Sequence, residues 1–190
     1  MTNKVRIAVF ASGSGSNFTA IEQACREGEL QAEIVHVITD KPDAYVIERA
    51  KQAEIPVTVL RPKAFESKAA HEHAVIDILQ AAETEWIILA GYMRLIGPNL
   101  LSAYPSRIIN IHPSLLPSFP GKDAIGQAIE HGVKVTGVTV HLVDAGMDTG
   151  PILAQEAVRV IEGDAEGTAE VIHKVEHVLY KETLKMLFEK

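Results

Sequence analysis

Short apolar segments alternate with amphipathic segments over the first 105 residues, and this alternation limits the possible folds more than any other feature of the chain. Residues 5–11 are apolar and rich in β-branched side chains, and a Ser- and Gly-rich loop leads from them into a helix-like segment that starts at Phe18. The pattern repeats, with strands predicted at 33–39, 57–60 and 86–90 and helices at 44–53 and 67–82. Such repeats are typical of a mostly parallel sheet covered by helices. We therefore predict an α/β protein with a Rossmann-like, mostly parallel sheet and helices on both faces.

The rest of the chain has a different residue pattern, with more polar residues and prolines at its predicted strand ends and loops. A predicted strand at 107–112 carries polar residues at its end, and the Pro-rich stretch that follows, 113–121, can be neither helix nor central strand. Further elements are then predicted: a helix at 124–131, strands at 135–141 and 152–160 on either side of a loop at 144–150, and a long helix at 168–189. Because neither a repeat nor a domain boundary is visible, we expect residues 1–190 to form a single domain.

Composition excludes several classes of protein. Apolar residues make up 47% of the chain, too many for a disordered protein, and every apolar run is far shorter than the ~18 residues of a membrane-spanning helix. The single cysteine, Cys25, cannot form an internal disulfide and the N-terminus lacks the layout of a signal peptide, so we expect a cytoplasmic protein. A net charge of −7 argues against non-specific nucleic-acid binding. Any anionic ligand must therefore be bound by local groups.

The loop at residues 12–17, with sequence SGSGSN, has the properties of a phosphate-binding loop. Its small residues allow backbone N–H groups to approach an anion, and it opens a helix whose N-terminus favours negative charge. It is not a Walker loop, because no Lys follows the second glycine at the required place, and it lacks the third glycine of the dinucleotide fingerprint. The alternative is a tight turn capped by Ser16 or Asn17.

A second candidate site lies at the end of the strand at 107–112. Asn110 and His112 are two residues apart on a strand and therefore point to the same face, and Pro113 restricts His112 to extended backbone geometry. An amide donor beside an imidazolium suits a carbonyl oxygen that becomes negative during attack. A carboxylate from Asp148, in a loop with Asp144, would favour the imidazolium. The alternative is a structural histidine and exposed turn residues.

One competing motif lies near the C-terminus. Residues 173–177, with sequence HKVEH, match the pattern of inverted zinc peptidases, in which His173 and His177 lie on one helix face. No obvious third ligand is present, and the motif explains nothing else in the chain. His71 and His73 diverge on their predicted helix, so we interpret both as surface residues.

Four stretches together carry a resemblance to a known family. They are ASGSGSN at 11–17, LAGYMR at 89–94, NIHPSLLP at 110–117, and GVTVH at 137–141 leading into DTGP at 148–151. On these stretches the chain resembles the phosphoribosylglycinamide formyltransferases, the folate-dependent enzymes of purine biosynthesis, over essentially its whole length. The third stretch is shared by formyltransferases in general, and the first, together with the short length of the chain, selects this family.

The resemblance implies a reaction and a set of binding residues. The formyl group of 10-formyltetrahydrofolate passes to the amine of N1-(5-phospho-D-ribosyl)glycinamide (glycinamide ribonucleotide), in a formyltransferase fold without a metal. The phosphate side is expected in the N-terminal half and the folate and catalytic side in the C-terminal half. The implied substrate ligands are Gly15, Ser16, Asn17 and Glu176, and the implied folate ligands are Lys68, Met93, Arg94, Leu95, Ile96, Asn110 and Asp144. Lys68 and Arg94, with Arg61 or Lys63, would serve the folate tail.

The resemblance also implies a catalytic trio, Asn110, His112 and Asp148. His112 as imidazolium and Asn110 as amide donor would stabilise the oxyanion, while Asp148 keeps His112 protonated and helps a water to move the amine proton. No covalent nucleophile is needed, so Cys25 is a spectator. We also predict a cis peptide bond at Leu116-Pro117, because this loop must turn sharply.

One position departs from the family. Relatives commonly carry a histidine where this chain has Asp123, which puts any supporting role there in doubt. Methionyl-tRNA formyltransferase and formyltetrahydrofolate deformylase share the trio but carry additional domains, for which this length leaves no room. A non-catalytic phosphate-binding module would leave the trio unexplained. We expect a monomer or homodimer that has neither nucleic-acid nor membrane partners.

Overall fold

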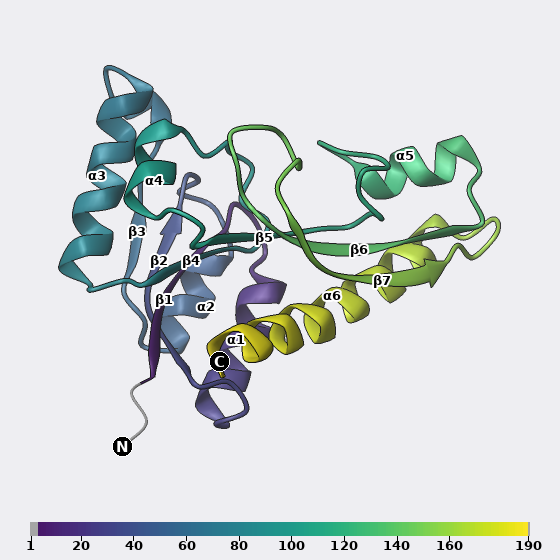
Figure 1. Ribbon diagram of the computed structural model, residues 1–190, viewed down its shortest axis with the longest axis horizontal. Helices are drawn as coiled ribbons and strands as arrows, with labels where there is room; N and C mark the ends of the chain where they lie inside the picture. The colour runs from purple at the N-terminus through teal and green to yellow at the C-terminus, as the bar shows by residue number, and fades with distance from the viewer. Residues whose placement is uncertain (1–3, 190) are drawn as a thin grey trace.

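Seven strands form a single sheet with the order β3-β2-β1-β4-β5-β6-β7 (Figure 1). The computed structural model describes residues 4–189. Its strands are β1 (Val5–Phe10), β2 (Ala32–Thr39), β3 (Val57–Val59), β4 (Trp86–Leu89), β5 (Ile108–His112), β6 (Val135–Leu142) and β7 (Ile152–Arg159). Its helices are α1 (Ser16–Arg26), α2 (Val46–Gln52), α3 (Lys68–Ala81), α4 (Pro98–Ala103), α5 (Ala124–His131) and α6 (Ala165–Phe188), with a 3₁₀ turn at Pro62–Ala64.

The five strands from β3 to β5 are parallel, and β6 and β7 continue the sheet in antiparallel fashion. The predicted mostly parallel α/β sheet is thereby confirmed. The chain runs outward from β1 through β2 to β3 and then crosses back to β4 on the other side of β1. This reversal creates a crevice above the carboxyl ends of β1 and β4, where ligands of such sheets bind.

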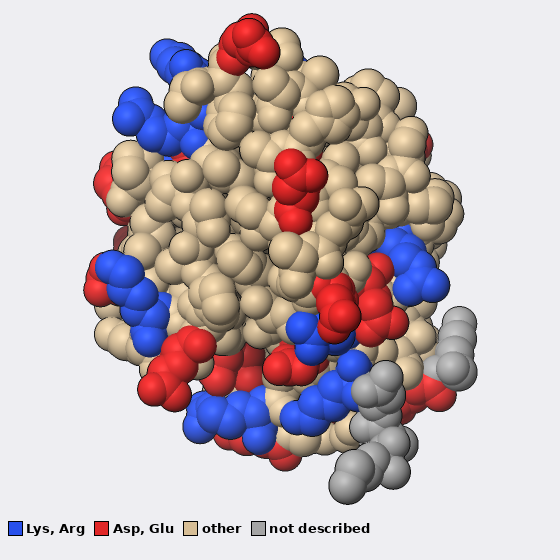
Figure 2. All heavy atoms as spheres, turned by 90° about the vertical axis from the view of Figure 1, so that its left-hand side faces the viewer, with Lys and Arg blue, Asp and Glu red and all other residues tan. Residues whose placement is uncertain are grey.

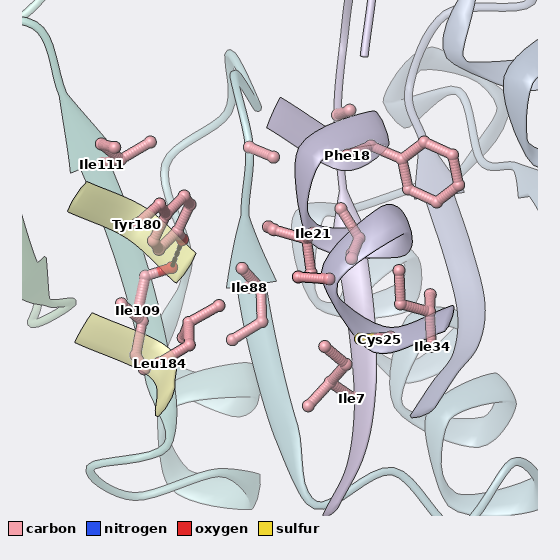
Figure 3. Packing of buried hydrophobic residues seen from close by; sticks show 14 of the residues in the cluster. Ile7, Phe18, Ile21, Cys25, Ile34, Ile88, Ile109, Ile111, Tyr180 and Leu184 are labelled. Atoms are coloured by element: carbon pink, nitrogen blue, oxygen red, sulfur yellow. Dashed lines mark hydrogen bonds between the residues drawn. The ribbon is translucent and has the colours of Figure 1, made fainter. Parts of the chain in front are cut away.

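The two faces of the sheet are covered by different helices. The larger hydrophobic core packs α1, α2 and α6 against one face, and a smaller core packs α3 and α4 against the other. Figure 3 shows the first face, where Ile21 of α1 lies beside Ile88 and Tyr180 of α6 lies beside Ile109. The Tyr180 hydroxyl lies in this core and is close to the main-chain oxygens of Leu89 (2.7 Å) and Ile109 (3.1 Å). The last helix is therefore tied to both central strands β4 and β5.

Element boundaries differ from the predicted ones by a few residues, and two elements were not predicted. Helix α6 begins at Ala165 because the Asp164 side chain accepts a hydrogen bond from the N–H of Gly167 and caps the first turn. Helix α4 and the 3₁₀ turn were missed because each spans less than two turns and has no visible apolar period. Glu72 caps α4 from α3 by accepting the N–H groups of Gly97 and Asn99. The predicted cis bond at Leu116-Pro117 is confirmed.

The surface interpretation is correct for His73 and wrong for His71. His71 is 7% exposed, and its Nε2 donates to the carbonyl oxygen of Leu60 over 3.1 Å. The segment around the 3₁₀ turn folds back over α3, and Phe65 packs edge-on against the His71 ring at 5.2 Å. Sequence spacing places a residue on a helix face but does not reveal which loop covers that face.

Charges of both signs are mixed on the side of the molecule formed by α3 and α4. There, Figure 2 shows Lys and Arg side chains beside Asp and Glu side chains along the lower rim, around a largely uncharged centre.

Between residues 4 and 189, the structure has no helix long and apolar enough to cross a membrane.

Candidate active site

A cavity of about 600 Å³ opens at the carboxyl edge of the sheet, where the loops after β1, β4 and β5 converge. It brings together nearly all of the residues singled out in the sequence: Gly15, Ser16, Asn17, Met93, Arg94, Leu95, Ile96, Asn110, His112, Asp144, Asp148 and Glu176. Lys68 does not line it. That residue lies in a second cavity of about 390 Å³, which shares Tyr92, Arg94, Leu95 and Ile96 with the first. The two cavities therefore adjoin along the segment 92–96.

One end of the main cavity is formed by the N-terminus of α1. The helix begins at Ser16 without a side-chain cap, so neither Ser16 nor Asn17 closes the turn in the way that the alternative interpretation required. The first backbone N–H groups of the helix are therefore free of side-chain partners. Asn17 is 9% exposed, and its buried Oδ1 has no hydrogen-bond partner among residues 4–189. Gly15 has a φ of 76°, and it lies so close to Val46 that a Cβ added to Gly15 would be 2.7 Å from Cγ2 of Val46.

Glu176 lines the cavity from α6, the helix that packs beside α1. It is 6% exposed, and its Oε2 lies 2.7 Å from Nδ1 of His173. The hydrogen bond from His173 to this carboxylate raises the pKa of His173, against the opposing effect of partial burial. Burial lowers the pKa of His177, whose Nε2 has no hydrogen-bond partner in the part of the chain that the structure describes. Within the described part of the chain, no group of three or more His, Cys, Asp or Glu side chains is arranged to hold a metal ion.

At the other end, β5 places Asn110 and His112 on the cavity wall. His112 is 5% exposed, and its Nε2 donates to the carbonyl oxygen of Phe119 over 2.8 Å. Its Nδ1 lies 3.5 Å from Oδ2 of Asp148. Both ring nitrogens thus face acceptors, an arrangement that a doubly protonated imidazolium satisfies.

The Asp148 carboxylate is held by the backbone around it. Its Oδ2 also accepts the N–H of Gly121 over 2.8 Å, which ties the loop of Asp148 to the Pro-rich stretch. Asp148 itself has a φ of 56°, in the left-handed region that few residues other than glycine adopt. Strained backbone of this kind persists where the surrounding structure fixes a functional group.

His141 joins this centre, although it was assigned no role from the GVTVH stretch that it ends. It is the direct neighbour of Asn110 in the antiparallel pairing of β5 with β6, and it is 2% exposed. Its Nδ1 donates to the carbonyl oxygen of Leu142 over 2.9 Å, which leaves Nε2 to accept from Nδ2 of Asn110 over 3.3 Å. The same Nε2 lies 3.8 Å from Oδ1 of Asp148. His141 therefore orients the Asn110 amide, and only the strand register reveals this.

The remaining loop residues have local partners. Asp144 accepts from the Thr149 hydroxyl over 2.6 Å and from the Gly146 N–H over 3.0 Å, and these bonds lower the pKa of Asp144. Asp123, where the family resemblance leads us to expect a histidine, caps α5 by accepting the N–H of Gly126 and lines the cavity. Cys25 lies outside the cavity, and burial raises the pKa of its thiol to about 12, which suppresses its nucleophilicity.

Arg94 is not free to serve a ligand with its whole side chain. Its Nε donates to Oδ2 of Asp40 over 2.9 Å, and Asp40 lies at the end of β2 with a side chain that is fully buried. No motif surrounds Asp40 in the sequence, so its contact with Arg94 was not predicted.

A model of the family described as formyl transferase matches residues 5–184. The chain belongs to the formyl transferase family. Phosphoribosylglycinamide formyltransferase of Bacillus subtilis is 55% identical to this formyltransferase over 96% of the chain and 94% of the relative. The crystal structure of phosphoribosylglycinamide formyltransferase from Bacillus halodurans matches with a TM-score of 0.95 and 56% identity, over 97% of this chain and 96% of that one. Glycinamide ribonucleotide transformylase 1 from Symbiobacterium toebii matches with a TM-score of 0.96 and 47% identity, over 100% and 90% of the two chains.

Proposed function

We propose that this formyltransferase transfers the formyl group of 10-formyltetrahydrofolate to the amine of glycinamide ribonucleotide, a step of purine biosynthesis. The observation that carries the proposal is the single cavity that joins an uncapped helix N-terminus to the Asn110, His112 and Asp148 centre. The first end suits a phosphate, and the second suits a carbonyl under attack. The names of relatives that are 55% and 56% identical over nearly the whole chain support it.

In the proposed reaction, the substrate amine attacks the formyl carbon and forms a C–N bond. Negative charge develops on the formyl oxygen and positive charge on the attacking nitrogen. The amine proton then moves to the folate nitrogen, and the bond between that nitrogen and the formyl carbon breaks. The products are the formylated glycinamide and tetrahydrofolate.

The residues of the catalytic end can stabilise this charge. One N–H of the Asn110 amide is directed to His141, which leaves the second for the formyl oxygen. His112, protonated beside Asp148, supplies positive charge next to that oxygen. Asp148 keeps the imidazolium in place and accepts the amine proton through a water on its way to the folate nitrogen.

At the phosphate end, the backbone N–H groups of Ser16 and Asn17 receive the phosphate, and the helix dipole favours its charge. The unpartnered Oδ1 of Asn17 fits a donor on the substrate, because a buried acceptor without a partner costs free energy. The Glu176 carboxylate lies at the same end and can accept from ribose hydroxyls or the glycinamide end. No excess of positive side chains is needed there, in agreement with the acidic composition.

The segment 93–96 forms the folate side of the site. Met93 and Leu95 are 59% and 55% exposed, and such exposed apolar side chains at a cavity rim suit a flat ring system. Asp144 and Asp148 enclose the same region from the opposite loop. Lys68 lines the adjoining cavity, which would receive a folate tail, and its ammonium group suits the carboxylates of that tail.

We further propose that residues 1–190 work as one domain, to which both halves contribute cavity residues. The protein is proposed to act in the cytoplasm as a monomer or homodimer, with its two small-molecule substrates as its only obligatory partners and without a metal. Metal analysis of the purified protein tests the last point, because stoichiometric zinc bound through His173 and His177 would contradict the folate mechanism.

The decisive experiment measures formyl transfer from 10-formyltetrahydrofolate to glycinamide ribonucleotide by the parent, His112→Ala and Asp148→Asn. We expect kcat to fall on the order of 10²- to 10⁴-fold in each variant, the range for a positioned proton-transfer group. His73→Ala removes an exposed histidine outside the cavity, and this control variant should keep the parent kcat. Full turnover by both catalytic variants would overturn the mechanism. Formate release without the ribonucleotide would instead identify a deformylase.

A further inference from the structure

Asp40 has no role in the mechanism above, yet it lies between the two loops that carry the substrates. It follows the last residue of β2, and its side chain is fully buried. Its Oδ1 accepts from the Ser12 hydroxyl over 2.6 Å, and its Oδ2 accepts from Nε of Arg94 over 2.9 Å. Ser12 begins the phosphate loop, and Arg94 belongs to the folate segment. A single buried carboxylate therefore bonds to both.

The bond to Ser12 determines what that hydroxyl does for the folate segment. A serine hydroxyl has one proton, and here the proton is donated to Asp40. The Ser12 oxygen is then left as an acceptor, and it receives the N–H of Met93 over 2.9 Å. The Ser12 N–H in turn donates to the carbonyl oxygen of Gly91 over 3.0 Å. Asp40 thus fixes the orientation in which Ser12 holds the segment that begins at Gly91.

The bond to Arg94 fixes the position of a cation between the two cavities. The Arg94 side chain is 48% exposed, so the rest of its guanidinium remains accessible while Nε is held by Asp40. Arg94 lines both cavities. Burial raises the pKa of Asp40, but the hydrogen bonds from Ser12 and Arg94 outweigh it and leave that pKa below its ordinary value. The carboxylate therefore keeps its charge at neutral pH.

We propose that Asp40 is a positioning residue for the formyl-transfer reaction, which locks the folate segment 91–96 against the phosphate loop through Ser12 and Arg94. The inference rests on the proposed function, because it assigns that segment to the folate. Asp40 touches no reacting atom. Asp40 holds the folate segment 91–96 in its binding geometry before the folate binds. Loss of Asp40 should therefore weaken folate affinity more than it slows the chemical step.

The test compares Asp40→Asn with the parent in steady-state kinetics. Asparagine keeps the size of the side chain but loses the charge that faces Arg94, and its amide can present a donor to Ser12. Hydrogen bonds to charged groups contribute about 1.5–3 kcal/mol, which corresponds to a roughly 10- to 100-fold rise in KM for the folate. We expect kcat to change less than about threefold. Asp43→Asn, an exposed residue of the same loop, is the matched control and should keep the parent values.

Ser12→Ala keeps the buried carboxylate with its Arg94 partner, and it removes both the hydroxyl that donates to Oδ1 of Asp40 and the acceptor for the Met93 N–H. It should raise the folate KM by a smaller factor, and it tests the proposal even if Asp40→Asn does not fold. In the double variant Asp40→Asn/Arg94→Gln, the rise in the folate KM should be smaller than the product of the two single rises, because the two residues share one contact. Parent folate KM in both Asp40→Asn and Ser12→Ala would overturn the proposal, as would an equal rise in both substrate KM values together with a fall in kcat.

Titration calorimetry with tetrahydrofolate separates failure of this inference from failure of the proposed function. A parent protein without formyl transfer would refute the function. The role of Asp40 would then be decided by the Kd for tetrahydrofolate, which should rise roughly 10- to 100-fold in Asp40→Asn. A Kd equal to that of the parent would refute the positioning role.

Discussion

The two ends of the main cavity are formed by different kinds of group. The phosphate end is largely backbone, namely an uncapped helix N-terminus and a glycine with positive φ, together with the buried side-chain amide of Asn17. The catalytic end is made of side chains from neighbouring strands and a loop: Asn110, His112, His141 and Asp148, which contact one another. A backbone site depends on the space around it, whereas a side-chain site depends on chemical identity. Substitutions at the two ends should therefore fail in different ways.

The largest effect is expected at the catalytic end. Asn110→Ala removes the proposed oxyanion donor, and loss of one such donor typically lowers kcat on the order of 10²- to 10³-fold. The KM for glycinamide ribonucleotide should stay within about threefold of the parent, because the phosphate end is intact. Steady-state kinetics with each substrate varied in turn gives both values. A rise in the KM for glycinamide ribonucleotide with unchanged kcat would contradict the proposed division of roles between the two ends.

A smaller effect is expected from Gly15→Ala at the phosphate end. The new methyl group meets Val46 and must adopt a φ of 76°, so strain and overpacking together should cost about 2–4 kcal/mol of unfolding free energy. The KM for the ribonucleotide should rise at least about tenfold, while kcat at saturation falls far less than in Asn110→Ala. Urea unfolding and kinetics measure the two effects.

Gly28→Ala is the matched control for this strain. Gly28 has a φ of 77° but no atom within 4 Å of its missing Cβ, so only the backbone cost of about 1–2 kcal/mol applies. Its ribonucleotide KM should equal that of the parent. If Gly28→Ala destabilised the protein as much as Gly15→Ala, close packing on Val46 would have no part in shaping the phosphate end.

The smallest effect tests the one charged pair of the described phosphate end, His173 with Glu176. The pKa of His173 is raised, so the stabilisation by the pair is fully present below the unfolded value of about 6.5 and is lost as the pH rises through the folded value. His173→Gln should cost about 0.2–1 kcal/mol of unfolding free energy at pH 6, and the difference from the parent should shrink toward zero at alkaline pH. Urea titrations across this range measure it. A difference that grows with pH, or one equally present in His73→Gln, would contradict the assignment.

The sequence predicted the positions whose role follows from chain order. The carboxyl ends of parallel strands share one edge, and the loops after β1, β4 and β5 meet there. Asp40 and His141 escaped prediction because their roles depend on contacts across strands. Asp40 acts through two loops far from it in the chain, and His141 faces Asn110 only because β6 runs antiparallel to β5 in one register.

The hydroxyl of Tyr180 has a thermodynamic consequence for ligand binding. It fastens α6 to the main-chain oxygens of Leu89 and Ile109, and Glu176 lies one helical turn before it. A ligand that contacts both α1 and Glu176 binds only while α6 is docked. By linkage, such a ligand adds RT ln(1 + [L]/Kd) to the free energy of undocking. In the proposed enzyme, substrate concentration therefore sets how often the last helix leaves the sheet, and with it the protection of its amide hydrogens from exchange.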